Sequence, residues 1–458
     1  MIRKLTFIIL VLQLVISYSY SQKQYSSDWK SIDNRPVPVW FENAKFGIFI
    51  HWGLYSVPAW APTDGNVYDK YAEWYWFRIK SGKPSQAFVD FHNNNYGNKF
   101  QYQDFVKDFN AQLFQPDDWA KIIKNSGAKY VVLTSKHHDG FAMWPSAESW
   151  NWNSVDVDPH RDLCGDLTTA VKKSGMHMGF YYSLYEWFNP LYKSNFEKYV
   201  QDYMLPQMKD LVARYEPDML WTDGEWEHTS SDWKSTDFLS WLYNESPVRN
   251  SIVVNDRWGK ETRGKHGGFF TTEYDLVHDG NANELKFDRP WEECRGIGGS
   301  FGYNRNEKLE DYSSSEELIH ILINKVARGG NLLLNIGPTA DGTIPVIMQQ
   351  RLADIGAWLQ VNGEAIYNTR KWDKTPIINQ DSKIFFTSKG EKLYAIVTRW
   401  PVKTLVIENM KRVSEIKLLG YDAKLKYRFK GDKLLIDISG INNTELPCSY
   451  AWVFQIKQ

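Results

Sequence analysis

Met219-Leu220-Trp221-Thr222-Asp223-Gly224-Glu225-Trp226 is an apolar run of strand type that ends in a carboxylate and is broken at once by a glycine. Side chains alternate along a strand, so Trp221 and Asp223 should point to the same face. If the strand belongs to a parallel barrel, its C-terminal end lies where active sites occur. Two interpretations follow. Asp223 is a nucleophile beside an aromatic wall suited to a sugar, or it caps the turn into the next helix.

Seven further segments share this pattern of a nearly continuous apolar strand. They are residues 45–50, 129–134, 178–182, 251–255, 268–273, 291–294 and 332–335. Helical patterns or long loops separate them, and the helices are poorly marked between Asp223 and Trp291. Apolar strands alternating with helices are typical of parallel strands buried on both faces. The sequence therefore predicts an α/β fold with a (β/α)8-like barrel.

Several helix boundaries are marked by capping residues. Pro116 lies in the first turn of one helix, and Gly127 is its predicted C-terminal cap. Asp166 is the predicted N-terminal cap of the next helix. Ser314 and Glu317 have the spacing of a capping box before an apolar helical segment.

The pattern changes after a helix at about residues 349–359. Short alternating strands with polar turns then follow at 383–387, 393–398, 404–407, 415–419, 424–429, 433–438 and 451–456. This spacing is typical of an antiparallel β-sandwich. The predicted domains are a catalytic barrel over residues 22–362 and a C-terminal β-sandwich over residues 363–458.

Composition favours a globular protein with a slight bias toward carbohydrate binding. The chain has 458 residues with 21 Trp and 26 Tyr, whose rings offer a flat apolar face and a polar tip. Such rings suit the C–H faces of sugars, although an aromatic-rich core is the alternative. The net charge of −1 and the pI of about 6.8 indicate no basic face, so nucleic acid and anionic membranes are not expected partners.

The N-terminus has the pattern of a secretory signal peptide over residues 1–21. Arg3 and Lys4 precede an apolar stretch, residues 5–16, that is too short to span a membrane. Ser19 and Ser21 are small residues at the positions expected before a cut. We expect an exported protein, periplasmic or secreted, with no membrane segment in its mature form.

Polar side chains gather at the ends of the predicted barrel strands. The candidates found this way are His51, His137, His138, Tyr181, Asp223, Arg257 and Glu273. Because parallel strand ends open on one face of a barrel, we expect these side chains to lie together.

Two carboxylates in this set can form a catalytic pair. Retaining glycosidases hold a nucleophilic carboxylate and an acid/base carboxyl group about 5–5.5 Å apart. Asp223 and Glu273 fit these two roles. The alternatives are that Glu273 only pairs with a nearby Lys or Arg, or that Glu225, Glu292 or Glu293 is the acid.

No metal or cofactor is predicted. His137 and His138 are adjacent, lack H-x-H spacing and would face opposite ways on a strand. Hydrogen bonding to substrate hydroxyls is the favoured use, with a core role for one of them as the alternative. Cys164, Cys294 and Cys448 lie far apart, which disfavours zinc and allows at most one disulfide.

Two further segments carry candidate binding groups. Glu73 and Trp74 follow the first strand, where the carboxylate could accept sugar hydroxyls and the indole could cover a ring face. An exposed loop stabilised by its aromatic side chains is equally compatible. Arg257 could orient a carboxylate or a hydroxyl, or form a structural ion pair with Asp256.

A glycine-rich run at residues 296–302 has the composition of a phosphate loop. It lacks the Lys-Ser/Thr ending and the strand-to-helix context of such loops. We expect instead a close backbone approach that presents Phe301 to the site.

Together these segments resemble the α-L-fucosidases of glycoside hydrolase family 29, from about residue 40 to about residue 367 and more loosely to the end. The matching pieces are Lys45-Phe46-Gly47-Ile48-Phe49-Ile50-His51-Trp52-Gly53, Ala72-Glu73-Trp74, Lys136-His137-His138-Asp139-Gly140-Phe141, Trp221-Thr222-Asp223, Asn255-Asp256-Arg257-Trp258, Thr272-Glu273-Tyr274, Ser300-Phe301-Gly302-Tyr303-Asn304 and Gly330-Asn331-Leu332-Leu333-Leu334-Asn335.

The resemblance implies a barrel with a C-terminal β-sandwich that hydrolyses terminal α-L-fucose from fucosylated glycans with retention, without metal or cofactor. Asp223 stands at the family's nucleophile position, and Glu273 where many bacterial-type members have the acid/base. The implied fucose-binding residues are His51, Tyr71, Glu73, Trp74, His137, His138, Tyr181, Trp221, Arg257 and Phe301, with Phe301 near the sugar's methyl group. The alternatives are a catalytically silent fucose-binding protein on this scaffold and a different retaining glycosidase.

Overall fold

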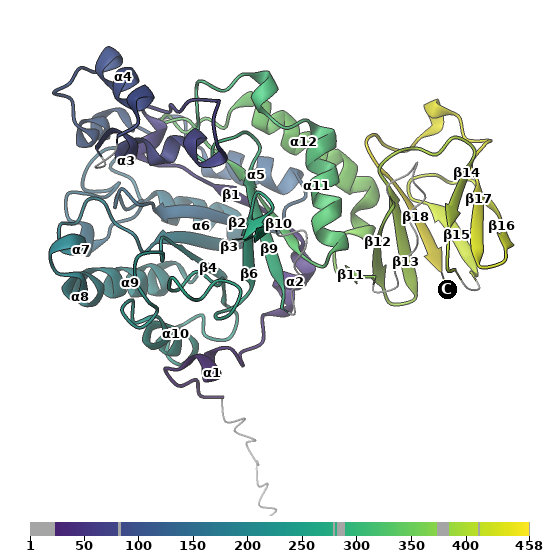
Figure 1. Ribbon diagram of the computed structural model, residues 1–458, viewed down its shortest axis with the longest axis horizontal. Coiled ribbons are helices and arrows are strands. Elements are labelled where there is room, and N and C mark those ends of the chain that lie inside the picture. Colours follow the sequence, from purple (N-terminus) through teal and green to yellow (C-terminus); the bar gives the residue numbers. More distant parts are fainter. Residues whose placement is uncertain are drawn as a thin grey trace, which may run out of the picture.

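Eight parallel strands form the centre of the chain. The computed structural model describes residues 23–80, 84–277, 280–281, 289–372, 384–410 and 413–457, so the predicted signal peptide lies outside the described residues. The strands are β1 (Phe46–Ile50), β2 (Tyr130–Lys136), β3 (His177–Ser183), β4 (Met219–Asp223), β5 (Val253–Val254), β6 (Phe270–Glu273), β9 (Trp291–Gly296) and β10 (Asn331–Ile336). They are hydrogen-bonded in the order β5-β4-β3-β2-β1-β10-β9-β6, with β7 (Leu276–Val277) and β8 (Gly280–Asn281) beyond β6. Strands β1, β2, β3, β4, β6, β9 and β10 are labelled in Figure 1. The predicted barrel-like sheet is confirmed.

The barrel closes between β5 and β6 through a short seam. Here the Gly268 and Phe269 amides donate to the Asn255 and Val254 carbonyls, each at 3.1 Å. A Cβ atom on Gly268 would lie only 1.9 Å from the Val254 carbonyl oxygen. The irregularity expected between Asp223 and Trp291 is therefore a seam that depends on a residue without a side chain.

We expect Gly268→Ala to lower the free energy of unfolding by about 1–3 kcal/mol, because the added methyl group forces the two strands apart. Gly440→Ala is the matched control, since a Cβ atom there meets nothing within 4 Å. Urea unfolding of the three proteins measures the effect. Equal stabilities of the two variants would contradict this account of the seam.

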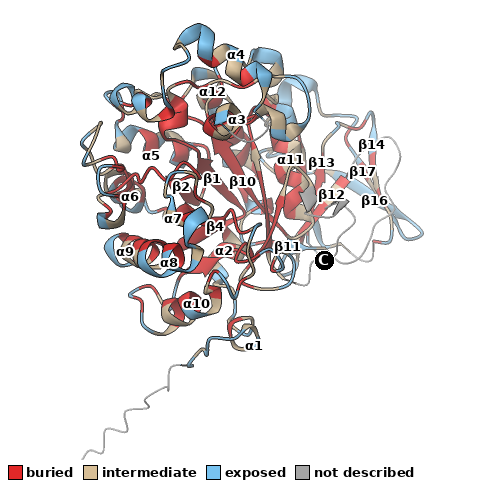
Figure 2. Cartoon of the chain, turned by 60° about the vertical axis from the view of Figure 1, so that its left-hand side comes forward, coloured by how far each residue is buried: buried red, intermediate tan, exposed pale blue. Residues whose placement is uncertain are grey.

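Helices surround the sheet, and α2 (Val39–Ala44) contributes Phe41 and Ala44 to the apolar cluster in its interior (Figures 1 and 2). The helices are α1 (Trp29–Ile32), α2 (Val39–Ala44), α3 (Tyr75–Lys80), α4 (Gln86–Asn95), α5 (Pro116–Asn125), α6 (Leu163–Lys173), α7 (Leu191–Ser194), α8 (Phe196–Tyr199), α9 (Leu205–Tyr215), α10 (Ser235–Asn244), α11 (Ser315–Ala327) and α12 (Val346–Asn362). None of those in the described ranges is long and apolar enough to cross a bilayer.

The capping box of Ser314 and Glu317 is confirmed, but the predicted cap at Asp166 is wrong. Asp166 lies inside α6, and Asp162 is the cap, accepting a 2.8 Å hydrogen bond from the Gly165 amide. An acidic residue in the first turn is stabilised by the helix dipole even when it is not the cap. Both aspartates therefore suit a helix start, and the pattern could not distinguish them.

Alternate side chains of the strands face two different apolar clusters. Ile48 and Ile50 of β1 pack against the outer helices, whereas Phe49 faces the barrel interior. Trp221 belongs to the same interior cluster as Phe49. Because Asp223 is two residues further along β4, it shares this interior face, as the alternation predicted.

The C-terminal region consists of two antiparallel sheets, as predicted. One contains β11 (Arg370–Lys371), β12 (Ile384–Lys389), β13 (Lys392–Val397), β18 (Trp452–Lys457) and β15 (Glu415–Leu418), and the other β14 (Thr404–Ile407), β17 (Lys433–Asp437) and β16 (Lys426–Lys430). The first sheet lies beside α11 and α12 (Figure 1). Hydrogen bonds of 2.8 Å join Trp358 Nε1 to the Ala451 carbonyl and His320 Nε2 to the Tyr450 carbonyl.

Candidate active site

A cavity of about 480 Å³ lies at the C-terminal ends of the barrel strands. All twelve site residues predicted from the sequence line it: His51, Tyr71, Glu73, Trp74, His137, His138, Tyr181, Trp221, Asp223, Arg257, Glu273 and Phe301. Six further residues complete the lining: Phe49, Tyr68, Arg78, Trp226, Arg263 and Cys294. The fold thus brings together side chains from positions up to 252 residues apart in the chain (49 to 301).

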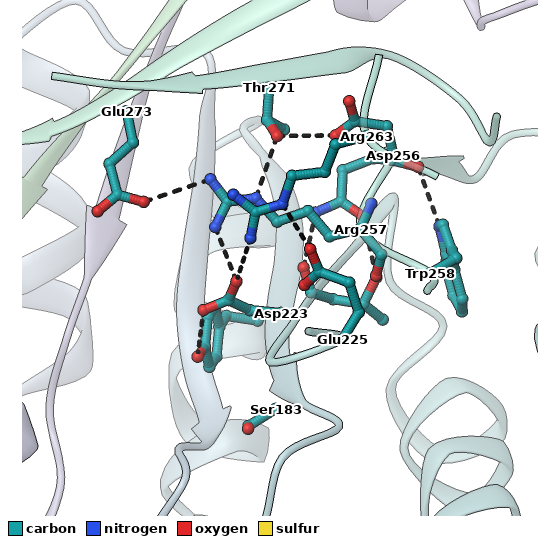
Figure 3. A network of polar contacts seen from close by, with 12 residues as sticks. Ser183, Asp223, Glu225, Asp256, Arg257, Trp258, Arg263, Thr271 and Glu273 are labelled. Atoms are coloured by element: carbon teal, nitrogen blue, oxygen red, sulfur yellow. Dashed lines mark hydrogen bonds and ion pairs between the residues drawn. The ribbon is translucent and has the colours of Figure 1, made fainter. Parts of the chain in front are cut away.

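Asp223 ends β4 and its carboxylate is held by three side chains (Figure 3). Arg257 Nη1 donates to Oδ1 at 2.7 Å, Arg263 Nη2 approaches the same oxygen at 3.4 Å, and the Tyr181 hydroxyl donates to Oδ2 at 3.0 Å. Burial raises the pKa of Asp223, but the two guanidinium charges outweigh burial and hold it low, at about 2. The carboxylate is therefore ionised at any ordinary pH. It does not cap the following turn.

Glu273 ends β6 on the other side of Arg257 (Figure 3). It accepts hydrogen bonds from the Tyr71 hydroxyl at 2.7 Å and from Arg257 Nη2 at 3.3 Å. Its side chain is 19% exposed, against 12% for Asp223. One guanidinium thus spans both carboxylates, and the more exposed of them is Glu273. The ion pair with an arginine, considered above as an alternative role for Glu273, is therefore present, and Arg257 is the partner.

The other glutamates considered as the acid lie outside this cavity lining. Glu292 is buried and accepts hydrogen bonds from Tyr130 and, at 3.1 Å, from Trp221 Nε1. Glu293 is also buried and pairs with Arg295 at 2.7 Å. Glu292 thereby orients an aromatic wall of the cavity, and its oxygens are occupied by structural partners.

Glu225 is the third of these glutamates and forms an ion pair with Nε of Arg263, whose Nη2 faces Asp223. It is 1% exposed, and one carboxylate oxygen, Oε2, has no partner among the described residues. Its contact fixes the guanidinium that faces Asp223. The alternative ion pair between Arg257 and Asp256 is not formed; Asp256 instead accepts from the Thr271 hydroxyl at 2.7 Å.

The protonation of His51 follows from its neighbours. Asn335 Nδ2 donates to the Phe301 carbonyl at 2.6 Å, so the amide oxygen of Asn335 faces His51 Nδ1 at 2.7 Å. Nδ1 must therefore carry the proton, which leaves Nε2 as an acceptor. Burial lowers the pKa of His51 to about 4, so the ring is neutral at neutral pH.

His138 is set in the same tautomer by a different partner. The Ser183 hydroxyl donates to the Tyr185 carbonyl at 2.7 Å and lies 2.6 Å from His138 Nδ1. The ring nitrogen must donate to that hydroxyl, and Nε2 again becomes an acceptor. Burial lowers the pKa of His138 to about 3. Two neutral imidazoles therefore offer acceptor nitrogens to a polyhydroxylated ligand.

His137 and His138 both line the cavity, so the expectation that they face opposite ways is wrong. Strand β2 ends at Lys136, and the two histidines lie in the turn that follows. Lys136 is anchored by a fully buried 2.7 Å ion pair with Glu186, and Gly140 completes the turn with φ +74°. Strand alternation no longer applies beyond the strand, which allows both rings to reach the site.

Glu73 is 2% exposed, which excludes the exposed-loop interpretation. Its Oε2 accepts from the Gly302 amide at 2.8 Å and from the Ser300 hydroxyl at 3.2 Å. The glycine-rich run therefore does approach closely, as predicted, and Phe301 lies within it. Burial raises the pKa of Glu73 to about 7. Beside it, the rings of Trp74 and Trp226 lie 5.9 Å apart.

Metal-ligating residues do not cluster in the part of the chain that the structure describes: no three His, Cys, Asp or Glu side chains lie together in a way that could hold an ion. Cys164, Cys294 and Cys448 are all unpaired thiols.

The sequence comparisons agree with this geometry. Residues 13–364 match the family model described as Alpha-L-fucosidase, and residues 379–457 match the Alpha-L-fucosidase C-terminal domain. The chain belongs to the α-L-fucosidase family. It is 43% identical to the human tissue α-L-fucosidase, with 95% of this chain and 92% of that protein covered. It is 46% identical to a Dictyostelium discoideum α-L-fucosidase, over 86% and 84%.

Solved structures of the family have the same fold. A Thermotoga maritima α-fucosidase, in complex with a mechanism-based inhibitor, superimposes with a TM-score of 0.81 at 38% identity. The match covers 95% of this chain and all of that one. The chain is accordingly a glycoside hydrolase of this family.

The six lining residues that sequence reasoning missed fall into two groups. Tyr68, Arg78, Trp226 and Arg263 come from loops or short helices, where no periodicity predicts direction. Phe49 and Cys294 lie on strands, and their direction could have been predicted. Phe49 is two residues before His51 on the same strand, so the two side chains share a face. Cys294 is paired with Glu273 on the neighbouring strand.

The buried neutral histidines predict a loss of stability in acid. A histidine whose folded pKa lies below its unfolded value of about 6.5 binds fewer protons when folded, so stability falls as pH drops from about 6.5 toward the folded value. His51→Asn keeps a hydrogen-bond donor for Asn335 but removes the titrating ring. For each pH unit of acidification in this window, we expect its free energy of unfolding to fall by about 1.4 kcal/mol less than that of the parent. Urea unfolding at pH 7 and pH 5 measures the difference. Parallel curves for the two proteins would contradict the assignment of a neutral His51.

Proposed function

We propose that this protein hydrolyses terminal α-L-fucose from fucosylated oligosaccharides and glycoconjugates, by double displacement with retention at the anomeric carbon. The observation that carries the proposal is the pair of carboxylates, Asp223 and Glu273, held on either side of Arg257 within one cavity. Membership of the α-L-fucosidase family supports the choice of sugar.

In the first step Asp223 attacks the anomeric carbon while Glu273 protonates the departing glycosidic oxygen. An ionised carboxylate is required for attack, and the contacts with Arg257 and Arg263 keep Asp223 in that form. The Tyr71 hydrogen bond orients the carboxyl group of Glu273. The products of this step are a covalent fucosyl-Asp223 ester and the free leaving group.

In the second step Glu273, now ionised, takes a proton from water as the water attacks the same carbon. The ester breaks, Asp223 leaves as a carboxylate and fucose is released. Two inversions at one carbon give net retention.

The remaining lining residues suit the shape of fucose. His51 and His138 offer acceptor nitrogens for its hydroxyls, and the buried carboxylate of Glu73 can accept further ones. Phe301 provides an apolar contact for the methyl group. Such a contact discriminates against the 6-hydroxylated analogue by only about 1–3 kcal/mol, so hydroxyl recognition must supply the remaining selectivity.

Release of nitrophenol from nitrophenyl α-L-fucoside by the purified protein tests the function. Turnover with retention, observed by NMR of the first-formed sugar, is expected. Binding of fucose without turnover of this substrate or of any fucosylated oligosaccharide would favour the catalytically silent binding protein. Turnover of a different glycoside alone would favour another retaining glycosidase.

We also propose that residues 1–21 direct export to the periplasm or the medium. The charged start, the short apolar stretch and the small residues before Gln22 support this proposal. N-terminal sequencing of the exported protein should begin at Gln22, and a product that retains residues 1–21 in the cytoplasm would contradict it.

A further inference from the structure

The leaving group of the proposed reaction must lie beside Glu273, because that carboxyl group protonates the oxygen through which the leaving group departs. From Glu273 two aromatic rings lead out of the cavity. The Tyr71 hydroxyl binds the carboxylate at 2.7 Å, and the Tyr68 ring meets the Tyr71 ring edge-on with centroids 5.7 Å apart. Tyr68 therefore lies on the path between the acid and solvent.

Tyr68 is unusual among the aromatic lining residues because it is 52% exposed. An exposed aromatic ring on a surface turn commonly has no partner and no function. Here, however, the ring lines the catalytic cavity. Burial and the negative charge of Glu273 both raise the pKa of Tyr68, which agrees with its position near that carboxylate.

The turn that carries Tyr68, residues Val67–Lys70, is fixed from both sides. Arg78 Nη2, from α3, donates to the Tyr68 carbonyl at 2.8 Å and lies 3.6 Å from Asp69. Asp69 in turn accepts from the Asn66 amide at 3.2 Å. The backbone of the turn is thus fixed before any ligand arrives, and the Tyr71 ring supports the ring of Tyr68, which lowers the entropic cost of binding to it.

A second aromatic wall of the cavity, formed by the half-buried Trp74 and Trp226, serves a different part of the site. The Trp74 and Trp226 rings lie 5.1 and 5.5 Å from His138, and the charge of Asp223 acts on that histidine. They therefore line the side of the nucleophile, where the fucose ring itself must be. Of the two rings beside the acid, Tyr71 is 5% exposed and is bound to Glu273, whereas Tyr68 is accessible to the leaving group.

We propose that Tyr68 forms a leaving-group subsite, on which the pyranose residue linked to fucose stacks through its C–H face. This inference rests on the proposed function, and it names the preferred substrates as glycosides whose leaving group is itself a sugar ring. A pyranose with axial C–H bonds on one face matches the flat apolar ring of a tyrosine. Small leaving groups gain nothing from this contact.

Two substrates separate the subsite from the chemistry. Methyl α-L-fucoside needs the acid but carries no second ring, whereas a fucosyl-hexose disaccharide needs both. The disaccharide is the linkage isomer, among α1-2, α1-3, α1-4 and α1-6, that the parent hydrolyses fastest. We expect Tyr68→Ala to lower kcat/KM for it by about tenfold, the equivalent of losing one aromatic contact of about 1.4 kcal/mol. The value for methyl fucoside should be unchanged, and Tyr68→Phe should resemble the parent on both.

The control variant is Tyr427→Ala, which removes a 38% exposed tyrosine from strand β16 of the C-terminal region. It should leave both substrates unaffected. Equal losses on both substrates in Tyr68→Ala would show that Tyr68 acts through Tyr71 on the acid, and would overturn the subsite. An unchanged kcat/KM of Tyr68→Ala on both substrates would also overturn the subsite. So would a parent protein that cleaves methyl fucoside but none of the disaccharides. A parent inactive on methyl and nitrophenyl fucosides alike would instead refute the proposed function.

Discussion

Asp223→Ala is expected to lower kcat on nitrophenyl α-L-fucoside by about 10³- to 10⁵-fold, since the covalent route contributes several kcal/mol to lowering the barrier. The fold should survive, because Arg257 keeps its contact with Glu273 and Arg263 keeps Glu225. Steady-state kinetics with this substrate measures the loss.

Added azide provides a sharper readout of the same variant. The small anion can occupy the space of the missing carboxylate and attack the anomeric carbon once, so the product should be β-L-fucosyl azide, with inverted configuration. Asp232→Ala is the matched control, since this exposed aspartate caps a turn at Thr229 and does not line the cavity. Full activity of Asp223→Ala would refute the assigned nucleophile.

Glu273→Gln is expected to give the second-largest effect, and one that depends on the leaving group. Without the acid, hydrolysis of methyl α-L-fucoside should fall by about 10²- to 10⁴-fold. A dinitrophenyl fucoside departs without protonation, so its first step should be nearly normal, and the covalent intermediate should accumulate as a burst. Azide should then yield α-L-fucosyl azide, with configuration retained.

Glu292→Gln is the control that decides between the two glutamates. Its amide oxygen can still accept from Trp221 Nε1. We expect a moderate loss that is the same for methyl and dinitrophenyl fucosides, because Glu292 acts on the cavity wall rather than on the departing oxygen. A steep dependence on the leaving group in Glu292→Gln, and none in Glu273→Gln, would transfer the acid/base assignment to Glu292.

The barrel and the positions of its site residues could be predicted because their causes are local. Strands buried on both faces are continuous apolar runs, and the polar residue that ends each run must lie at the barrel mouth. Asp223 and Glu273 follow this rule directly, as the last residues of β4 and β6. No knowledge of tertiary contacts is needed to place them together.

Contacts made by loops could not be predicted in the same way. Arg263 reaches Asp223 from the segment between β5 and β6, and only the folded chain shows that Glu225 directs it there. The alternation rule also failed for His137 and His138, because it was applied beyond the end of β2. Sequence patterns specify the direction of a side chain only while the backbone remains periodic.

The packing of the C-terminal sheet against the barrel couples the unfolding of the two regions. Tyr394, Ile396, Ala451 and Val453 belong to the same buried cluster as the residues beneath the barrel helices. Separating the two regions would uncover apolar faces on both at once. The chain should therefore melt in a single cooperative transition, and a fragment truncated after α12 should aggregate even though it contains every residue of the cavity.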